Sequence, residues 1–241
     1  NMTYGYEYGD SILRIISKKL NSLYSEKRRL FRFSSDRFVM LIDNPNKVEE
    51  VEEDIIEIVD ILEREFFTQG QKRTVEINMG IVRINGTYKK PDEIIRDATI
   101  AVSYVDGRNY LTHAFYDKAM LNKIRREETI ESEIIGSLVD PRTEKLFLVY
   151  QPIIDTRSKK TVGFEALARL KTDAFGYVSP TEFIEITERR HLINRLGEWI
   201  FQSSLLFLKQ LEYEGYEGMK ISVNISGVQL MDSSFRSKIM D

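Results

Sequence analysis

The sequence contains no cysteine, which excludes disulfide bonds, thiolate zinc sites and a cysteine nucleophile, and which fits a reducing compartment. Histidine is almost as rare, because only His113 and His191 occur in 241 residues. This scarcity argues against a histidine-rich metal centre and against a Ser-His-Asp triad. Any metal site must therefore rely on oxygen ligands, which favour Mg²⁺, Mn²⁺ or Ca²⁺.

Long hydrophobic runs and an excess of basic residues are also absent. No apolar run approaches the ~20 residues that span a bilayer, and no signal peptide is recognisable. The formal net charge is −3, so no basic field points to nucleic acid as a partner. We expect this portion of the protein to be cytoplasmic, with any membrane attachment supplied by segments upstream of it.

Both ends of the sequence lie close to predicted elements. A helical pattern begins within ten residues of Asn1, and a strand-like segment ends shortly before Asp241. We therefore expect the sequence to be part of a longer protein. Its length and its hydrophobic content of 42% allow two packed domains.

The first half alternates predicted helices and strands. A helix is predicted from Asp10, whose carboxylate at the helix start would accept hydrogen bonds from free backbone N–H groups. The segment RLFRFSSDRFVMLI (29–42) predicts two strands joined by a turn at SSDR. A second helix is predicted over 46–67, where an apolar stripe from Val48 to Phe66 opposes a solvated acidic face. A strand over 74–84, a helix over 91–105 and a strand over 110–116 complete a compact α/β domain.

The second half begins with a long predicted helix from Asp117 to Leu138 that connects the domains. Strands are predicted over 145–155, 161–170 and 219–226, and helices from residue 180 and over 192–215. Ser179 and Glu182 have the spacing of a capping box, with Pro180 at the first helical position. The order strand, helix, strand predicts a parallel sheet or the start of a barrel.

The segment GFEALARL predicts a strand with two unlike faces. Glu165 and Arg169 share one face, and the residues of the other face are all apolar (Phe164, Ala166, Ala168 and Leu170). Two interpretations remain open: a buried Glu–Arg ion pair, or a metal-binding carboxylate beside a phosphate-binding arginine. Asn224 falls near the end of its strand, where barrel enzymes place functional residues, although a turn-forming asparagine is the simpler alternative.

Four segments, YQPIID, GFEALARL, SPTEFIEITE and VNISGVQL, resemble in order and spacing the first part of an EAL domain. This is the family of cyclic di-GMP phosphodiesterases. The resemblance covers Thr143–Asp241 and implies the N-terminal part of a (β/α)8 TIM-like barrel. Such a barrel takes about 250 residues, so we expect more than half of it to lie beyond the sequence.

The resemblance implies a role for each matching residue. Glu165 and Asn224 match metal ligands for Mg²⁺ or Mn²⁺, and Gln151 and Arg169 match residues that bind the dinucleotide. The implied reaction is hydrolysis of cyclic di-GMP to linear pGpG, with the general base and the remaining acidic ligands beyond Asp241. The resemblance also implies a homodimer through the EAL domain. The alternative is a catalytically inactive cyclic di-GMP receptor that acts through protein–protein contacts.

Segments of the first half, among them FRFSSDRFVMLI, INMGIVRI and DGRNYLTHAFYD, resemble a GGDEF domain of the diguanylate cyclase family. The resemblance covers residues 1–120 without the first strand of the family, and residues 121–142 are the expected connecting helix. The signature positions are occupied by Ser34, Ser35, Asp36, Arg37 and Phe38. The predicted fold is therefore α/β: a cyclase-like α+β domain with a central sheet, followed over 143–241 by the first part of the EAL barrel.

The signature departs from an active cyclase in its chemistry. Both glycines are replaced, and their side chains obstruct close approach of the backbone to a nucleotide. Arg37 replaces an acidic residue and opposes a divalent cation. The lysine expected before the GRN motif is also missing, so we expect no cyclase activity. Asn1 and Asp10 match residues that recognise guanine, which makes GTP a candidate regulatory ligand of an inactive domain. The alternative is that Asp10 only caps its helix and that Asn1 is a turn residue.

Overall fold

The computed structural model describes residues 6–23, 28–34, 36–43, 48–63, 66–68, 71–73, 77–105, 112–232 and 235. The chain divides into two compact units, Asn1–Leu121 and Asn122–Asp241. Each unit mixes helices and strands, which confirms the predicted α/β class. In the described part of the chain, none of the helices combines the length and the apolar character of a membrane span.

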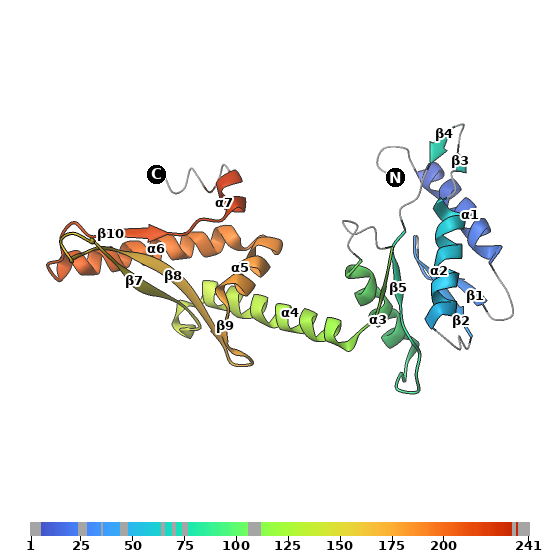
Figure 1. The fold of residues 1–241 in the computed structure, drawn as a ribbon, viewed down its shortest axis with the longest axis horizontal. Helices are drawn as coiled ribbons and strands as arrows, with labels where there is room; N and C mark the ends of the chain where they lie inside the picture. The colour runs from blue at the N-terminus through green and yellow to red at the C-terminus, as the bar shows by residue number, and fades with distance from the viewer. Residues whose placement is uncertain are drawn as a thin grey trace. The chain divides into compact units, whose positions relative to one another are not determined.

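Where the structure describes it, unit 1 combines short strand pairs with the helices α1, α2 and α3 (Figure 1). In chain order its elements are α1 (Tyr6–Asn21), β1 (Arg28–Arg32), β2 (Phe38–Ile42), α2 (Val48–Glu63), β3 (Phe66–Thr68), β4 (Gln71–Arg73), β5 (Met79–Ile81), α3 (Pro91–Ser103) and β6 (His113–Phe115). β1–β2 and β3–β4 are antiparallel pairs, and β5 pairs with β6 in parallel.

The core of unit 1 lies between the first two helices and the β1–β2 hairpin. Ile16 and Leu20 of α1 are buried with Leu62 of α2. Phe38 and Met40 of the hairpin pack against this cluster. The predicted apolar stripes of both helices therefore face the core, as their 3.6-residue period requires.

Two predicted helix boundaries in unit 1 are wrong. α1 begins at Tyr6, so Asp10 is exposed in the second turn and does not cap the helix. A glycine such as Gly9 costs only about 1 kcal/mol within a helix, which packing of the following turns offsets. α2 ends at Glu63, and Phe66 belongs to β3. Phenylalanine is favoured in strands, and the segment with Phe66 pairs with β4 instead of extending the helix.

Unit 2 is a four-stranded sheet covered by helices. Its elements are α4 (Lys118–Val139, most of which belongs to this unit), a 3₁₀ turn (Pro141–Thr143), β7 (Leu146–Ile154), β8 (Thr161–Thr172), β9 (Gly176–Val178), α5 (Pro180–Arg189), α6 (Ile193–Tyr213), β10 (Lys220–Val223) and α7 (Gly227–Met231). β8 pairs with β10 in parallel and with β7 and β9 antiparallel. The predicted strand–helix–strand unit is thus a parallel crossover from β8 to β10 (Figure 1).

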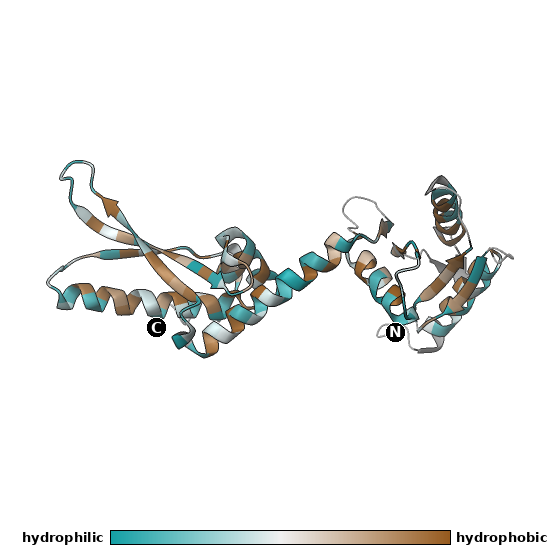
Figure 2. Cartoon of the chain, turned by 90° about the horizontal axis from the view of Figure 1, so that it is seen from below, coloured by the Kyte–Doolittle hydropathy of each residue, from teal (hydrophilic) through white to brown (hydrophobic). Residues whose placement is uncertain are grey.

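One face of this sheet is the core of unit 2. Ala166 and Leu170 of β8 are 3% and 0% exposed, as predicted from the alternation of GFEALARL. Leu170 packs with buried residues from three helices, which are Ile130 and Ile134 of α4, Phe183 and Ile186 of α5, and Ile193, Leu196 and Ile200 of α6. Hydrophobic and hydrophilic residues alternate along α4 and α6, as expected for helices that cover a sheet (Figure 2).

Ion pairs also join α4 to the rest of unit 2. The Nε and Nη2 atoms of Arg126 donate to the two carboxylate oxygens of Glu182 at 2.6 and 2.9 Å. Glu182 is therefore not part of the predicted capping box, and Ser179 makes no side-chain capping bond, although Pro180 is the first helical residue. A bidentate charge-assisted pair is stronger than a neutral capping bond, so Glu182 binds Arg126 instead of capping its own helix.

We predict that the Arg126–Glu182 pair stabilises unit 2 only when Glu182 is ionised. The hydrogen bond from Arg126 lowers the pKa of Glu182. The stabilisation of unit 2 by this pair is therefore complete above the unfolded pKa of about 4.3. It is lost as the pH falls through the lower pKa that Glu182 has in the folded state. Both side chains are about one-third exposed, so a double-mutant cycle with Arg126→Ala and Glu182→Ala should give about 0.5–1 kcal/mol at pH 7.

Fluorescence of Trp199 during urea unfolding measures this coupling, because it is the single tryptophan of the chain and lies on α6 of unit 2. The pair between Arg142 and Asp140 is the control, since the Arg142 side chain is 89% exposed and the coupling should be close to zero. A coupling for Arg126 and Glu182 that persists at pH 2 would contradict the electrostatic explanation.

His191 supplies a second stability prediction. It has φ +57° at the end of α5, where Leu192 donates its N–H to the Thr187 carbonyl at 2.8 Å. Left-handed backbone costs a residue with a Cβ about 1–2 kcal/mol, whereas glycine adopts it freely but loses more chain entropy on folding. Because His191 is exposed, His191→Gly should raise the free energy of unfolding by about 0.5–1 kcal/mol.

The matched control is Gly215, which ends α6 with φ +90° and has no atom within 4 Å of the position of an added Cβ. Gly215→Ala should destabilise unit 2 by about 1 kcal/mol for the same backbone reason. Trp199 fluorescence again reports both variants. If His191→Gly lowers the unfolding midpoint, the histidine side chain stabilises this turn and backbone strain is the wrong explanation.

Candidate metal and nucleotide site

The second face of the β7–β8–β10 sheet carries the polar residues that the sequence singled out. Gln151 of β7 lies directly opposite Glu165 of β8, and opposed residues of antiparallel strands share one face. Ser222 of β10 lies beside Glu165 on the other side. Glu165 is partly buried and Gln151 is exposed, so the carboxylate is supported by the sheet but open to solvent.

The structure brings Glu165 and Asn224 into contact. The Nδ2 atom of Asn224, one residue beyond the end of β10, donates to Oε1 of Glu165 at 2.8 Å. β10 can run this close because β8 has a glycine at position 163. A Cβ on Gly163 would lie 2.5 Å from the carbonyl oxygen of Lys220. The close approach of the two strands therefore positions the two side chains.

A short segment after Asn224 is held by a capping box. Ser226 Oγ accepts from the N–H of Gln229 at 3.3 Å, and Gln229 Oε1 accepts from the N–H of Ser226 at 3.0 Å. The buried Gln229 also donates to the carbonyl of Ile193 at 3.2 Å, which ties the segment to α6. Sequence reasoning missed this support, although the SGVQ segment has the required spacing.

Arg169 does not pair with Glu165. Its Nη1 atom donates to the carbonyl of Ala168 at 2.9 Å, and no carboxylate of the described residues forms an ion pair with it. The interpretation of these two residues as a buried Glu–Arg pair is therefore wrong. Arg169 lies on the same face as Glu165, opposite Phe147 of β7, and retains donors for a ligand.

The donor set fits a hard divalent cation. Asn224 directs its NH₂ group at Glu165, and rotation of the amide about χ2 by 180° presents its oxygen on the same side. Mg²⁺ often takes only one or two protein oxygens and completes its shell with water and substrate phosphate. Within the described residues, no group of three or more histidine, aspartate or glutamate side chains could hold a metal. One carboxylate and one amide oxygen are thus the candidate ligands.

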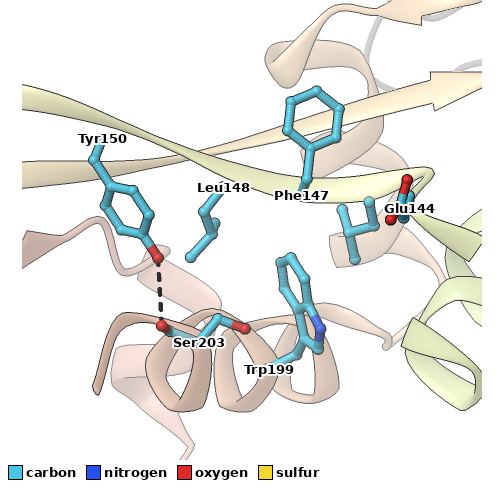
Figure 3. A pocket seen from close by; sticks show the side chains of 7 residues that line it. Glu144, Phe147, Leu148, Tyr150, Trp199 and Ser203 are labelled. Carbon is cyan, nitrogen blue, oxygen red and sulfur yellow. Dashed lines mark hydrogen bonds between the residues drawn. The ribbon is translucent and has the colours of Figure 1, made fainter. Parts of the chain in front are cut away.

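A hollow of about 460 Å³ lies elsewhere in unit 2, between β7 and α6 (Figure 3). Leu148 and Tyr150 point toward α6, whereas Phe147 points the other way. Tyr150 donates its hydroxyl to the carbonyl of Ser203 at 3.3 Å, and burial raises the pKa of Tyr150. This hollow opens on the helix-covered side of β7, so it is not the site of Glu165.

The predicted turn in unit 1 is a hairpin turn. The backbone N–H groups of Phe33 and Ser34 donate to the carbonyl of Arg37 at 2.9 and 3.3 Å, and Arg32 pairs with Phe38 at the hairpin end. Ser34, Asp36 and Arg37 are exposed. The predicted signature residue Ser35 and the predicted GTP ligand Asn1 lie outside the described residues.

Comparison with known proteins supports this division of the chain. The model of the diguanylate cyclase GGDEF domain matches residues 1–107, and that of the EAL domain matches residues 137–241. Protein y4lL of Sinorhizobium fredii is 27% identical over 99% of the chain, and the cyclic di-GMP phosphodiesterase NbdA of Pseudomonas aeruginosa is 24% identical over 99%. The chain spans 28% and 30% of the length of these two relatives.

Among solved structures, the EAL enzyme Bd1971 bound to cAMP and cyclic di-GMP is 26% identical over 64% of this chain and 40% of its own, with a TM-score of 0.44. EAL domains as a family are metal-dependent phosphodiesterases, in keeping with the oxygen ligands described above. The chain therefore contains a GGDEF domain followed by the first part of an EAL domain, and its relatives include cyclic di-GMP signalling proteins.

Proposed function

We propose that the protein containing this chain hydrolyses cyclic di-GMP to linear pGpG at its EAL domain, with Mg²⁺ or Mn²⁺ as cofactor. The observation that carries the proposal is the 2.8 Å contact between Glu165 and Asn224 on the open face of the sheet. The printed activity of the relative NbdA supports the choice of substrate. The absence of cysteine fits a cytoplasmic location for this portion.

Each residue of the face then has a distinct task. Glu165 and Asn224 hold the cation through oxygen atoms, and a bound divalent cation lowers the pKa of water and offsets charge on the phosphate oxygens. Arg169 binds a phosphate through its planar guanidinium, and Gln151 orients the nucleotide with a neutral amide beside Glu165. The general base and further acidic ligands come from residues beyond Asp241, and the EAL domain acts as a homodimer.

The GGDEF domain has a regulatory function in this proposal. Arg37 brings a positive charge to the position of an acid, and the side chain of Ser34 fills space that a nucleotide phosphate needs. The domain therefore makes no cyclic di-GMP. Asn1 and Asp10 bind the guanine of GTP as a regulatory ligand, and Asp10 is exposed on α1 as this requires.

We predict that Glu165→Gln lowers hydrolysis of cyclic di-GMP by the complete protein at least 100-fold, because it removes the negative charge of the ligand set and an uncharged amide oxygen binds a divalent cation more weakly than a carboxylate does. Chromatography of pGpG in the presence of Mg²⁺ measures the rate, and calorimetric titration with Mn²⁺ measures the lost metal affinity. Glu212→Gln, at an exposed position of α6, is the matched control and should be as active as wild type. Wild-type protein that binds cyclic di-GMP tightly but never cleaves it would establish the receptor function instead.

GTP titration tests the first domain. Wild-type protein should bind GTP without producing cyclic di-GMP, and Asp10→Ala should weaken binding by roughly 10-fold or more, the effect of losing a hydrogen bond to a charged group. Glu52→Ala, which removes an exposed carboxylate of α2, should bind GTP as wild type does. Failure of the wild-type protein to bind GTP would refute the regulatory role, and synthesis of cyclic di-GMP would refute the loss of cyclase activity.

A further inference from the structure

Beyond Arg169, the open face of the sheet continues into a group of aromatic and basic side chains. Arg169 lies opposite Phe147 of β7, and Lys171, two residues further along β8, lies opposite Tyr177 of β9. Directly opposed residues share a face, and alternation along β8 places Lys171 on the face of Glu165. The structure therefore extends the predicted site by three residues: Phe147, Lys171 and Tyr177.

Phe147 and Lys171 each interact with the ring of Tyr177. The rings of Phe147 and Tyr177 meet edge to face, with centroids 6.5 Å apart and an angle of 72°. The Nζ atom of Lys171 lies 5.8 Å from the centroid of the Tyr177 ring. Phe147 and Lys171 thus both act on the orientation of the tyrosine ring, from the neighbouring strands β7 and β8.

Tyr177 is 70% exposed although it is large, aromatic and held in place. Exposure alone does not distinguish Tyr177, since Tyr213 of α6 is 94% exposed; the interactions with Phe147 and Lys171 do. An exposed and oriented ring is suited to stacking on a flat ligand, and nucleobases stack on aromatic side chains whatever their sequence.

The order of groups along the face matches the order of groups in a dinucleotide. From Glu165, Arg169 is four residues and Lys171 six residues along the strand, about 13 and 20 Å at the rise of an extended strand. Asn224 lies one residue beyond the end of β10, in the direction of Arg169. The two proposed metal ligands therefore lie at the Glu165 end of this row of side chains. A cyclic dinucleotide has two phosphates in its central ring and bases on opposite sides of it, so a phosphate held beside Asn224 leaves one base directed along β8 toward Tyr177.

We propose that Tyr177, oriented by Phe147 and Lys171, is the stacking subsite for the guanine base farther from the metal. Lys171 adds a positive charge for the phosphate on that side. The inference rests on the proposed function and deepens it, because the subsite makes the enzyme prefer a dinucleotide over a small phosphodiester. A contact with the distant base is made equally in the bound substrate and in the transition state, so it acts on KM and not on kcat.

Kinetics of the complete protein with two substrates test the subsite. For cyclic di-GMP, Tyr177→Ala should raise KM about 10- to 100-fold with kcat unchanged, the usual effect of losing one stacked base. For bis(p-nitrophenyl) phosphate with Mn²⁺, which needs the metal but offers no guanine, kcat/KM should not change. Tyr177→Phe keeps the ring and should behave as wild type for both substrates.

Tyr213→Ala is the matched control, because Tyr213 is 94% exposed on α6 of the same unit, and it should leave all parameters unchanged. Lys171→Gln should raise KM for cyclic di-GMP less than Tyr177→Ala does, and should reduce the dependence of KM on salt concentration.

The results separate failure of the subsite from failure of the proposed function. If wild type cleaves cyclic di-GMP and Tyr177→Ala has an unchanged KM, the subsite is refuted while the function stands. If Tyr177→Ala loses activity on both substrates and lowers the unfolding midpoint of Trp199 fluorescence, the tyrosine is structural and the subsite is again refuted. If wild type binds without cleaving, calorimetry with cyclic di-GMP should show the same 10- to 100-fold loss for Tyr177→Ala. Absence of both binding and cleavage in wild type overturns the function and the subsite together.

Discussion

The candidate site depends on the register of β8. Side chains alternate along a strand, so Leu170 and Ala166 can be buried against the helices only if Glu165 and Arg169 are on the opposite face. A slip of one residue would expose the leucine and place the ionised carboxylate in the apolar core, which costs far more than one core contact stabilises. The core on one face thus determines the chemistry of the other face.

Packing against the helices and ion pairs beside the strand hold β8 in this register. α4 contributes Ile130 and Ile134 to the core and binds α5 through Arg126 and Glu182. Lys145, at the start of β7, donates to Glu133 of α4 at 2.9 Å and to Asp173 of the β8–β9 turn at 2.7 Å. α4, which precedes the sheet in the chain, is therefore part of the framework that positions Glu165. Gly163 and the capping box at Ser226 fix the position of the remaining strand, β10.

Sequence reasoning predicted features whose signals are local and periodic. The helical stripes, the two faces of β8 and the hairpin around Ser34 follow from spacing and turn chemistry alone. It failed where a distant partner competes with a local signal, since Glu182 binds Arg126, 56 residues away, instead of capping its own helix. The contact of Asn224 with Glu165 spans 59 positions and depends on strand pairing, so the strand patterns raised each residue separately and only the family resemblance joined them in one site. Tyr177 was missed because the short β9 strand gives too weak a pattern to reveal its register against Lys171.

The hairpin turn of unit 1 can form from backbone hydrogen bonds alone, whereas the candidate site of unit 2 depends on its side chains. The hairpin turn needs only the backbone bonds from Phe33 and Ser34 to the Arg37 carbonyl, and serine and aspartate form such turns readily. Nucleotide chemistry at the same turn needs bare backbone and negative charge. An arginine in place of an acid reverses an interaction of about 4 kcal/mol between unit charges at about 4 Å in a partly screened site. The turn is therefore compatible with these residues as architecture, whereas the candidate site of unit 2 depends on side chains: a carboxylate and a guanidinium on one face of β8, with the amide of Asn224 bound to the carboxylate.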